Sequence, residues 1–280
     1  MKIIKNPKEL NHIIMRLKKK NKRIGFVPTM GYLHEGHLSL VRRARKENDI
    51  VIVSIFVNPT QFGPKEDYKN YPRDLNQDKR LLAAKKVDYL FLPSRSLIYP
   101  KGFKNYINPG PLARHLCGLK RPGHFRGVVT VVNRLFEIVQ PDRAYFGEKD
   151  YQQVKVVQDM VRTQNLDVTI KTCPIIREKD GLAMSSRNRY LSKKERIHAK
   201  SLYQSLVQAK KMIDSKETNP MRVKKMIEMI LKPNVDKIDY IEIVNPQKLT
   251  SVRKIKLPIL IALACFVGRT RLIDNMVIKR

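Results

Sequence analysis

Residues 50–57, Ile-Val-Ile-Val-Ser-Ile-Phe-Val, form a nearly uninterrupted apolar run in which most side chains are β-branched. A strand of this kind is typical of a parallel sheet whose two faces are both covered by helices. A shorter apolar run at 24–27 precedes it, and between the two runs Leu40, Val41 and Ala44 recur at the spacing of one helix face. The order of strand, helix and strand therefore predicts a β-α-β unit.

The same alternation continues along the chain as far as residue 176. We predict a helix at 36–47, a helix after Asp74 with Leu75, Leu81 and Leu82 inward, an apolar helix ending near Val139, and strands at 89–92, 142–146 and 168–176. Such alternation is typical of an α/β fold with a Rossmann-like, doubly wound parallel sheet. The polar stretch at 93–127 interrupts it and is predicted to be a long loop.

The order of elements changes beyond Arg177. Helices are predicted at 192–212 and 221–231, followed by strands at 240–244, 259–267 and 276–278, which is typical of a smaller C-terminal α+β domain. With 280 residues, two domains are the natural expectation, at 1–176 and 177–280, and one large α/β domain is the alternative.

Composition narrows the class of protein. Hydrophobic residues make up 42% of the chain, and no apolar run approaches the roughly 20 residues that cross a bilayer, so we expect no membrane partner. The first residues lack the apolar region of a secretory signal. Cys117, Cys173 and Cys265 lie far apart, which excludes a Cys-x-x-Cys site and argues against a disulfide framework. A cytoplasmic location is the simplest expectation.

The formal net charge of +32 raises the hypothesis of nucleic-acid binding. Lysine and arginine are spread along the whole chain, however, and no basic stripe interleaved with aromatic residues occurs. A general drift of composition towards lysine accounts for the charge equally well. We therefore expect no specific nucleic-acid partner, and a basic RNA- or DNA-binding protein remains the rival from another class.

The segment 28–37, Pro-Thr-Met-Gly-Tyr-Leu-His-Glu-Gly-His, joins the first predicted strand to the first predicted helix. It places His34 and His37 where unpaired backbone N–H groups and the helix dipole attract an anion. This predicts a phosphate-binding turn, although the spacing of a P-loop is absent. The alternative is a tight turn that carries two solvent-exposed histidines.

Polar residues also follow two other predicted strands. Asn58 and Gln61 come directly after 50–57, and Lys149, Asp150 and Gln153 follow the strand at 142–146. Because the carboxyl ends of parallel strands meet at one edge of a sheet, these amides and charges are candidates for ligand contacts there. The alternatives are a plain proline-glycine turn after Asn58 and a helix-capping role for Asp150.

Two loops carry further candidate groups. The loop at 180–188 offers hydroxyls, backbone amides and the Arg187 guanidinium, which suit a polyphosphate, while a polar turn between domains is the alternative. The segment 121–127, Arg-Pro-Gly-His-Phe-Arg-Gly, presents basic groups that could face an anionic ligand.

Four of these motifs, in this order, resemble the pantoate–β-alanine ligase (pantothenate synthetase) family of nucleotidyltransferases: 28–37, 58–62, 147–153 and 184–188. The resemblance implies ATP-dependent condensation of pantoate with β-alanine through pantoyl adenylate, giving pantothenate, AMP and pyrophosphate. It also implies a homodimer and a Mg²⁺ requirement, since a divalent ion stabilises the leaving pyrophosphate. Another adenylyl- or cytidylyl-transferring member of the superfamily is the alternative within enzymes.

The resemblance implies a role for each matching residue. His37, His34, Lys149 and Arg187 would be catalytic. Pantoate would contact Gln61, Gln153 and Asn58, with Gln61 also near β-alanine, and Asp78 is the protein-side candidate for the metal. ATP would contact Met30, Gly31, Tyr32, Leu33, His34, Glu35, Gly36, His37, Gly147, Glu148, Lys149, Asp150, Ile176, Met184, Ser185, Ser186 and Arg187. The last four would form a flap over the outer phosphates.

Overall fold

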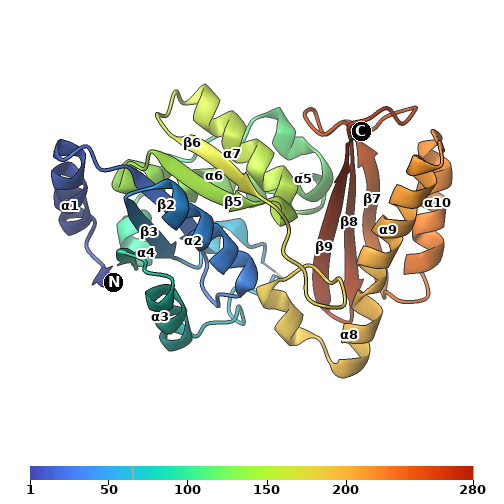
Figure 1. Cartoon of the computed structure of the whole chain (residues 1–280), viewed down its shortest axis with the longest axis horizontal. Coiled ribbons are helices and arrows are strands. Elements are labelled where there is room, and N and C mark those ends of the chain that lie inside the picture. Colours follow the sequence, from blue (N-terminus) through green and yellow to red (C-terminus); the bar gives the residue numbers. More distant parts are fainter. Residues whose placement is uncertain (65, 280) are drawn as a thin grey trace. The chain divides into compact units, whose positions relative to one another are not determined.

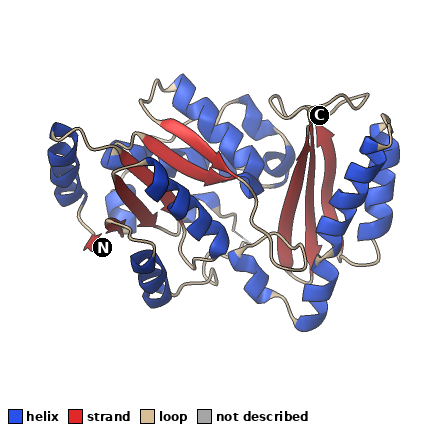
Figure 2. Cartoon of the chain, viewed as in Figure 1, coloured by secondary structure: helices blue, strands red, loops and turns tan. Residues whose placement is uncertain are grey.

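The computed structural model describes residues 1–64 and 66–279 (Figure 2). Their contacts divide the chain into two compact units. We call Met1–Gly110, Arg121–Glu148 and Gln153–Pro174 the N-terminal unit. The remaining segments, Pro111–Lys120, Lys149–Gln152 and Ile175–Arg280, form the C-terminal unit. A division into two domains between residues 176 and 177 stays a prediction.

The N-terminal unit is built on a six-stranded sheet in the order β1-β4-β3-β2-β5-β6, and every pairing in it is parallel (Figure 1). Its strands are β1 (Lys2–Ile4), β2 (Ile24–Thr29), β3 (Ile50–Ile55), β4 (Tyr89–Phe91), β5 (Arg143–Gly147) and β6 (Thr169–Cys173). From the central β2 the chain runs outward through β3 to β4 and returns to the other side of β2 as β5. The predicted α/β fold with a parallel sheet is confirmed.

Helices cover both faces of this sheet. Phe26 packs edge-to-face against Phe136 of α6 (His124–Val139), whereas the next residue, Val27, belongs to a cluster with Val41 of α2 (Glu35–Glu47). Successive side chains of a strand point to opposite faces, so α2 and α6 lie on opposite sides of the sheet. The other helices here are α1 (Pro7–Lys19), α3 (Leu75–Ala84), α4 (Arg95–Ile98) and most of α7 (Tyr151–Thr163), with the 3₁₀ helix η1 (Pro59–Gln61). The 3₁₀ helix η3 (Glu148–Asp150) crosses from this unit into the C-terminal unit.

The C-terminal unit contains the antiparallel sheet β7-β8-β9, which confirms the predicted smaller α+β part. Its strands are β7 (Lys237–Val244), β8 (Ile259–Val267) and β9 (Thr270–Ile278), and its helices are α5 (Leu116–Lys120), α8 (Lys193–Ala199), α9 (Ser201–Asp214) and α10 (Pro220–Leu231). The short helices η2 (Pro111–Arg114) and η4 (Ser186–Tyr190) also belong to it. The central strand β8 is buried along nearly its whole length, as its apolar sequence requires.

Several element predictions were wrong in detail. The single helix at 192–212 is two helices, because the Ser201 hydroxyl donates to His198 O at 2.7 Å and the Lys200 N–H reaches back only three residues, to Ile197 O. The loop at 93–127 contains short helices, and α6 already begins at His124. The strand at 168–176 spans only 169–173, and Leu75, at the first position of α3, is exposed rather than inward.

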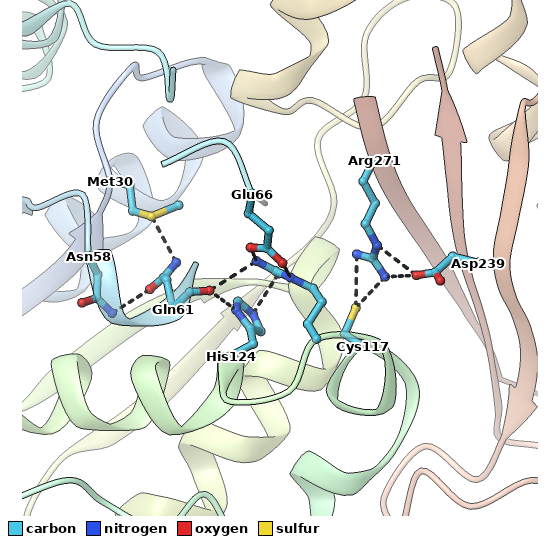
Figure 3. Close-up of polar contacts among 9 residues, drawn as sticks. Met30, Asn58, Gln61, Glu66, Cys117, His124, Asp239 and Arg271 are labelled. Carbon is cyan, nitrogen blue, oxygen red and sulfur yellow. Dashed lines mark hydrogen bonds and ion pairs between the residues drawn. The ribbon is translucent and has the colours of Figure 1, made fainter. Parts of the chain in front are cut away.

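A half-buried ionic cluster around the buried Cys117 joins distant parts of the C-terminal unit. The Arg271 guanidinium donates to Asp239 Oδ2 at 3.0 and 2.7 Å, and both of its terminal nitrogens lie 3.7 Å from the Cys117 sulfur (Figure 3). The Tyr240 hydroxyl lies 3.2 Å from the same sulfur. Burial, reinforced by the neighbouring Cys117, raises the pKa of Tyr240 well above its ordinary value. Cys117 in α5 is thereby attached to β7 and β9.

Native cysteines are expected to react slowly with thiol reagents. All three are free and buried, and burial raises the pKa of Cys173 above its ordinary value and that of Cys265 to about 12. Because the thiolate is the nucleophile, DTNB at pH 8 should label fewer than about one thiol per native chain within minutes. After the protein is unfolded in guanidinium, DTNB should label all three thiols. Rapid labelling of Cys265 in the native protein would contradict the buried position of β8.

Within the described residues, no helix combines the length and the apolar character that crossing a lipid bilayer demands.

Candidate active site

The two histidines of the 28–37 turn form the N-terminal cap of α2. His34 is the N-cap residue, and its Nδ1 accepts the Gly36 N–H at 3.1 Å. His37 Nδ1 accepts the His34 N–H at 3.3 Å, which completes a reciprocal capping box. The centroids of the two rings lie 4.1 Å apart. The sequence therefore folds both imidazoles back against the first turn of the helix.

These bonds fix which ring nitrogen carries the proton. A backbone N–H can only donate, so Nδ1 of each ring is the acceptor and, in the neutral imidazole, the proton lies on Nε2. Two Nε2–H donors are thus held at a helix N-terminus, where the helix dipole also favours negative charge. An arrangement of this kind can bind phosphate oxygens and stabilise charge that develops on them.

A buried carboxylate holds the turn in place. Asp78 of α3 accepts the Tyr32 N–H at 2.9 Å through Oδ2 and the Leu33 N–H at 2.7 Å through Oδ1. Gly31 has a φ of +79°, which favours glycine, and an added Cβ would lie only 2.9 Å from a methyl carbon of Ile55. The side chain of Asp78 therefore determines the backbone path that leads into His34.

Asp78→Asn is expected to destabilise the protein by about 2–3 kcal/mol. The asparagine oxygen can accept only one of the two backbone N–H groups in this geometry, and the NH₂ group of the amide then faces the second N–H group, donor against donor. Asp74→Asn is the matched control in the same helix. Asp74 caps α3 by accepting the Gln77 N–H at 2.9 Å, and asparagine caps as well as aspartate. Thermal unfolding of both variants should show a lowered Tm for Asp78→Asn alone. Equal Tm values would contradict the anchoring role.

The structure assigns no ready-made metal site to these residues. Among the residues described, no group of three or more His, Cys, Asp or Glu side chains is placed to hold a metal ion. Both oxygens of Asp78 are engaged by backbone donors, so this carboxylate does not fit the role of a dedicated Mg²⁺ ligand. Coordination of a metal ion by Asp78 stays a prediction from the resemblance alone.

Gln61 is positioned from several sides within the N-terminal unit. Its Nε2 contacts Met30 Sδ at 3.1 Å, and its Oε1 accepts from Asn58 Nδ2 at 3.1 Å (Figure 3). Its backbone carbonyl lies 2.8 Å from His124 Nδ1. Gln61 and Met30 follow β3 and β2, which are neighbours in the sheet. Gln61 thus contacts Met30 of the 28–37 turn, while its role in binding a substrate stays a prediction.

Asn58 is 1% exposed, and its amide is fully used within the protein. Its Nδ2 donates to Gln61 and to Gly127 O at 3.1 Å. Its Oδ1 accepts from the Tyr99 hydroxyl at 2.8 Å and from Thr60 Oγ1 at 3.0 Å. These bonds favour a role in orienting Gln61, and the proposed contact between Asn58 and a substrate stays a prediction.

Gly127 allows α6 to touch η1 directly. A Cβ atom at this position would lie 2.3 Å from Thr60 O and 2.7 Å from Gln61 N, which is closer than atoms approach in proteins. Both neighbours are backbone atoms, so no side-chain rotation relieves the clash. The absence of a side chain at Gly127 is therefore part of what fixes the position of Gln61.

The remaining candidates of the N-terminal unit lie at the end of β5 and in α7. Gly147 ends β5, Glu148 opens η3, and Gln153 is half-buried in the first turn of α7. Because β5 is the neighbour of β2 on the side away from β3, its end lies at the point where the strand order reverses, the usual ligand position in open α/β sheets.

The other candidates belong to the C-terminal unit. Lys149 and Asp150 are neighbours, with Nζ 3.9 Å from Oδ1, and the Lys149 carbonyl accepts from Asn275 Nδ2 at 2.9 Å. Ile176 O accepts the Met184 N–H at 3.0 Å. Ser185 caps η4 by accepting the Arg187 N–H at 3.3 Å, and Ser186, which opens η4, is buried. Ile176 and the predicted flap residues therefore share one local loop structure.

Three contacts that hold these residues in position have no signal in the sequence, although Asp78 itself is a candidate there for a different role. Tyr99 hydrogen-bonds Asn58, Glu66 pairs with Arg121, and the Asp78 carboxylate anchors the turn at Tyr32. Each partner is at least 41 residues away in the chain, so no local pattern indicates these contacts. His124 and Arg121 do have a sequence signal, as basic groups in a proline- and glycine-containing segment.

Comparison with known proteins identifies the family. The family model for pantoate-beta-alanine ligase matches residues 2–277. The chain belongs to the pantoate-beta-alanine ligase family. Pantothenate synthetase of Pseudothermotoga lettingae is 56% identical over 279 residues, covering 99% of both chains, and that of Fervidobacterium nodosum is 54% identical over 279 residues, covering 100% of both. The resemblance predicted from four motifs is thus confirmed.

Solved structures of the family have the same fold. Pantothenate synthetase from Thermus thermophilus superposes with a TM-score of 0.95 at 44% identity, covering 100% of both chains. Pantoate-beta-alanine ligase from Francisella tularensis, complexed with beta-gamma ATP and beta-alanine, has a TM-score of 0.84 at 41% identity, covering 99% of this chain and 97% of that chain. The fold of the pantoate-beta-alanine ligase family therefore extends over the whole described chain.

Proposed function

We propose that this member of the family condenses pantoate with β-alanine at the expense of ATP. The pantoate carboxylate attacks the α-phosphorus of ATP, which releases pyrophosphate and forms pantoyl adenylate. The β-alanine amine then attacks the acyl carbon, loses a proton and displaces AMP, which leaves pantothenate. The observation that carries the proposal is the pair of imidazoles at the start of α2, with both Nδ1 atoms engaged by backbone N–H groups.

The chemistry of the proposed reaction requires positioning more than a protein nucleophile. Aligning a weak carboxylate nucleophile with the α-phosphorus lowers the entropic barrier, and Nε2–H donors of His34 and His37 stabilise negative charge on the phosphates. Gln61 and Gln153 would hold pantoate. Gly147 and Asp150 would contact the ribose of ATP, and Ile176 would contact its adenine. Lys149 would lie near the nucleotide, against a phosphate or the base. Mg²⁺ would enter with the ATP phosphates.

An AMP assay tests the overall reaction. Purified protein is incubated with ATP, Mg²⁺, pantoate and β-alanine, and AMP is expected only when pantoate is present. AMP formation without pantoate, or no AMP at all, would remove the ligase assignment. Retention of nucleic acid with a steep salt dependence and a sequence preference would instead favour the rival class.

Labelled pantoate tests the intermediate. With ¹⁸O in the pantoate carboxylate, attack on the α-phosphorus transfers one labelled oxygen to AMP when the amine displaces it. Label in pyrophosphate or inorganic phosphate, with none in AMP, would mean that a different phosphorus is attacked. Omitting β-alanine should still allow pantoate-dependent release of pyrophosphate in a first turnover.

We also propose a homodimer in the cytoplasm, on the strength of the resemblance. Analytical ultracentrifugation should give a mass about twice the 32.7 kDa of one chain. A species of one chain mass at micromolar concentration would contradict the dimer.

A further inference from the structure

The carbonyl of Gln61 is the last carbonyl of the 3₁₀ helix η1 and needs a donor from outside that helix. His124, at the first position of α6, supplies it, because its Nδ1 lies 2.8 Å from Gln61 O. Arg121 Nη2 adds a longer contact of 3.4 Å to the same oxygen. Gln61 is therefore held at its side chain by Asn58 and Met30 and at its backbone by the segment 121–124 (Figure 3).

The partners of His124 determine its protonation. A carbonyl oxygen only accepts, so Nδ1 must carry the proton that it donates to Gln61. Arginine only donates, and Arg121 Nη1 lies 3.1 Å from His124 Nε2, so Nε2 must present a lone pair. The two contacts occur together only in the neutral imidazole with its proton on Nδ1. This is the opposite tautomer from that of His34 and His37.

Arg121 is itself held rigidly. Its Nε and Nη2 donate to Glu66 Oε1 and Oε2 at 2.7 and 2.5 Å, and the two side chains are only 15% and 27% exposed. Burial opposes ionisation of Glu66, but the hydrogen bonds and charge of Arg121 outweigh it and lower the pKa of the carboxyl. A bidentate pair of this kind gives the guanidinium one orientation. Arg121 thereby directs one N–H bond at His124.

We infer that His124 is a positioning residue, whose Nδ1–H tautomer, selected by the Arg121–Glu66 pair, holds the Gln61 backbone and so aims the Gln61 side chain at its substrates. The inference rests on the proposed function of Gln61 in binding pantoate and β-alanine. His124 acts through Gln61 and not on a reacting atom.

Two substitutions of similar polarity separate this role from direct contact with a substrate. In His124→Asn the amide nitrogen occupies the place of Nδ1 and can still donate to Gln61 O. In His124→Gln the amide reaches the place of Nε2 and leaves that carbonyl without its donor. His124→Ala removes both positions. The three variants thus differ in which ring nitrogen they imitate.

The experiment compares kcat and KM for each substrate together with Tm. We expect His124→Ala and His124→Gln to raise KM for pantoate and KM for β-alanine roughly 10- to 100-fold. KM for ATP should stay within about twofold of the wild-type value. In His124→Asn, KM for pantoate and KM for β-alanine should both lie within about threefold of the wild-type values. Rescue by Gln rather than Asn would show that Nε2 is used directly and would overturn the inference. Equal KM values in all three variants would overturn it too.

A measurement on the wild-type protein separates this inference from the proposed function. Long-range ¹H–¹⁵N correlation spectra of ¹⁵N-histidine-labelled protein at pH 7, assigned with the His124→Asn variant, report the tautomer without any substrate. We expect the Nδ1–H form at His124. An imidazolium, or a proton on Nε2, would overturn the inference even if the ligase assay succeeds. Absence of pantoate-dependent AMP would remove the proposed function and leave the tautomer result standing.

Discussion

His37→Ala is expected to lower the rate of pantoate-dependent AMP formation by roughly 10²- to 10³-fold, the usual effect of removing one preorganised donor to a developing negative charge. The same substitution removes the acceptor of the His34 N–H. Loss of such a capping bond costs about 1 kcal/mol, which corresponds to a decrease in Tm of about 2–4 °C in a protein of this size. The loss of turnover should therefore far exceed the loss of folded protein. Steady-state AMP assays and thermal unfolding measure the two effects.

Two further variants separate the roles of the ring nitrogens of His37. His37→Asn keeps an acceptor close to the place of Nδ1 and lacks the Nε2–H donor, so its Tm should stay near that of wild type while turnover remains low. His12→Ala, at an exposed position of α1, is the control for the substitution itself and should change neither quantity. Recovery of turnover by His37→Asn would mean that the histidine serves only the helix cap.

Gly127→Ala is expected to affect both stability and substrate binding. The added methyl group would overlap the backbone of Thr60 and Gln61, so η1 must move away from α6. Overpacking of this kind costs about 2–3 kcal/mol, or roughly 5–10 °C in Tm. Because displacement of about 1 Å can cost 10²-fold in rate, kcat/KM for pantoate should decrease by about that factor.

Gly63→Ala is the matched control for this prediction. A Cβ at Gly63 would make only ordinary contacts of 3.7 Å with Glu66, although this glycine lies just two residues beyond Gln61. We expect its Tm and its kcat/KM to stay within experimental error of wild type. A Gly127→Ala variant that behaves like Gly63→Ala would mean that η1 and α6 do not touch as the structure shows.

The parallel sheet could be predicted from the sequence because its signal is local. A buried parallel strand must be apolar on both faces, as 50–57 is, and a helix between two such strands shows its own apolar stripe. The first helix and strand were missed, since α1 is rich in lysine and buries only Leu10 and Ile14 in full. The predicted strand at 276–278 omits the part of β9 before Met276, because polar Asp274 and Asn275 are buried in the middle of this strand, with Asp274 paired to Arg177 at 2.7 Å.

For the candidate site, the sequence predicts the groups that follow each strand but not the groups that hold them. His34, His37 and Gln61 could be proposed from their position after strands alone. The resemblance makes Asp78 a metal candidate, whereas in the structure its two oxygens accept N–H groups of residues more than forty positions away in the chain. Such long-range hydrogen bonds depend on how helices are placed over the sheet, and the spacing of residues in the sequence does not predict that placement.

The C-terminal unit is assembled from pieces that are not contiguous in the chain. Gln152 accepts the Cys117 N–H at 2.9 Å and donates to Leu112 O and His115 O, which ties two short inserted segments together. Leu116 then fills a cluster with Val244 and Leu260 of the antiparallel sheet. During synthesis, residues 111–120 leave the ribosome long before β7 and β8 do, so Leu116 has no partner from this sheet until those strands have been made. A gene fragment that starts at residue 175 would encode the antiparallel sheet but not residues 111–120, so the apolar side chains of Val244 and Leu260 would lack their contact with Leu116.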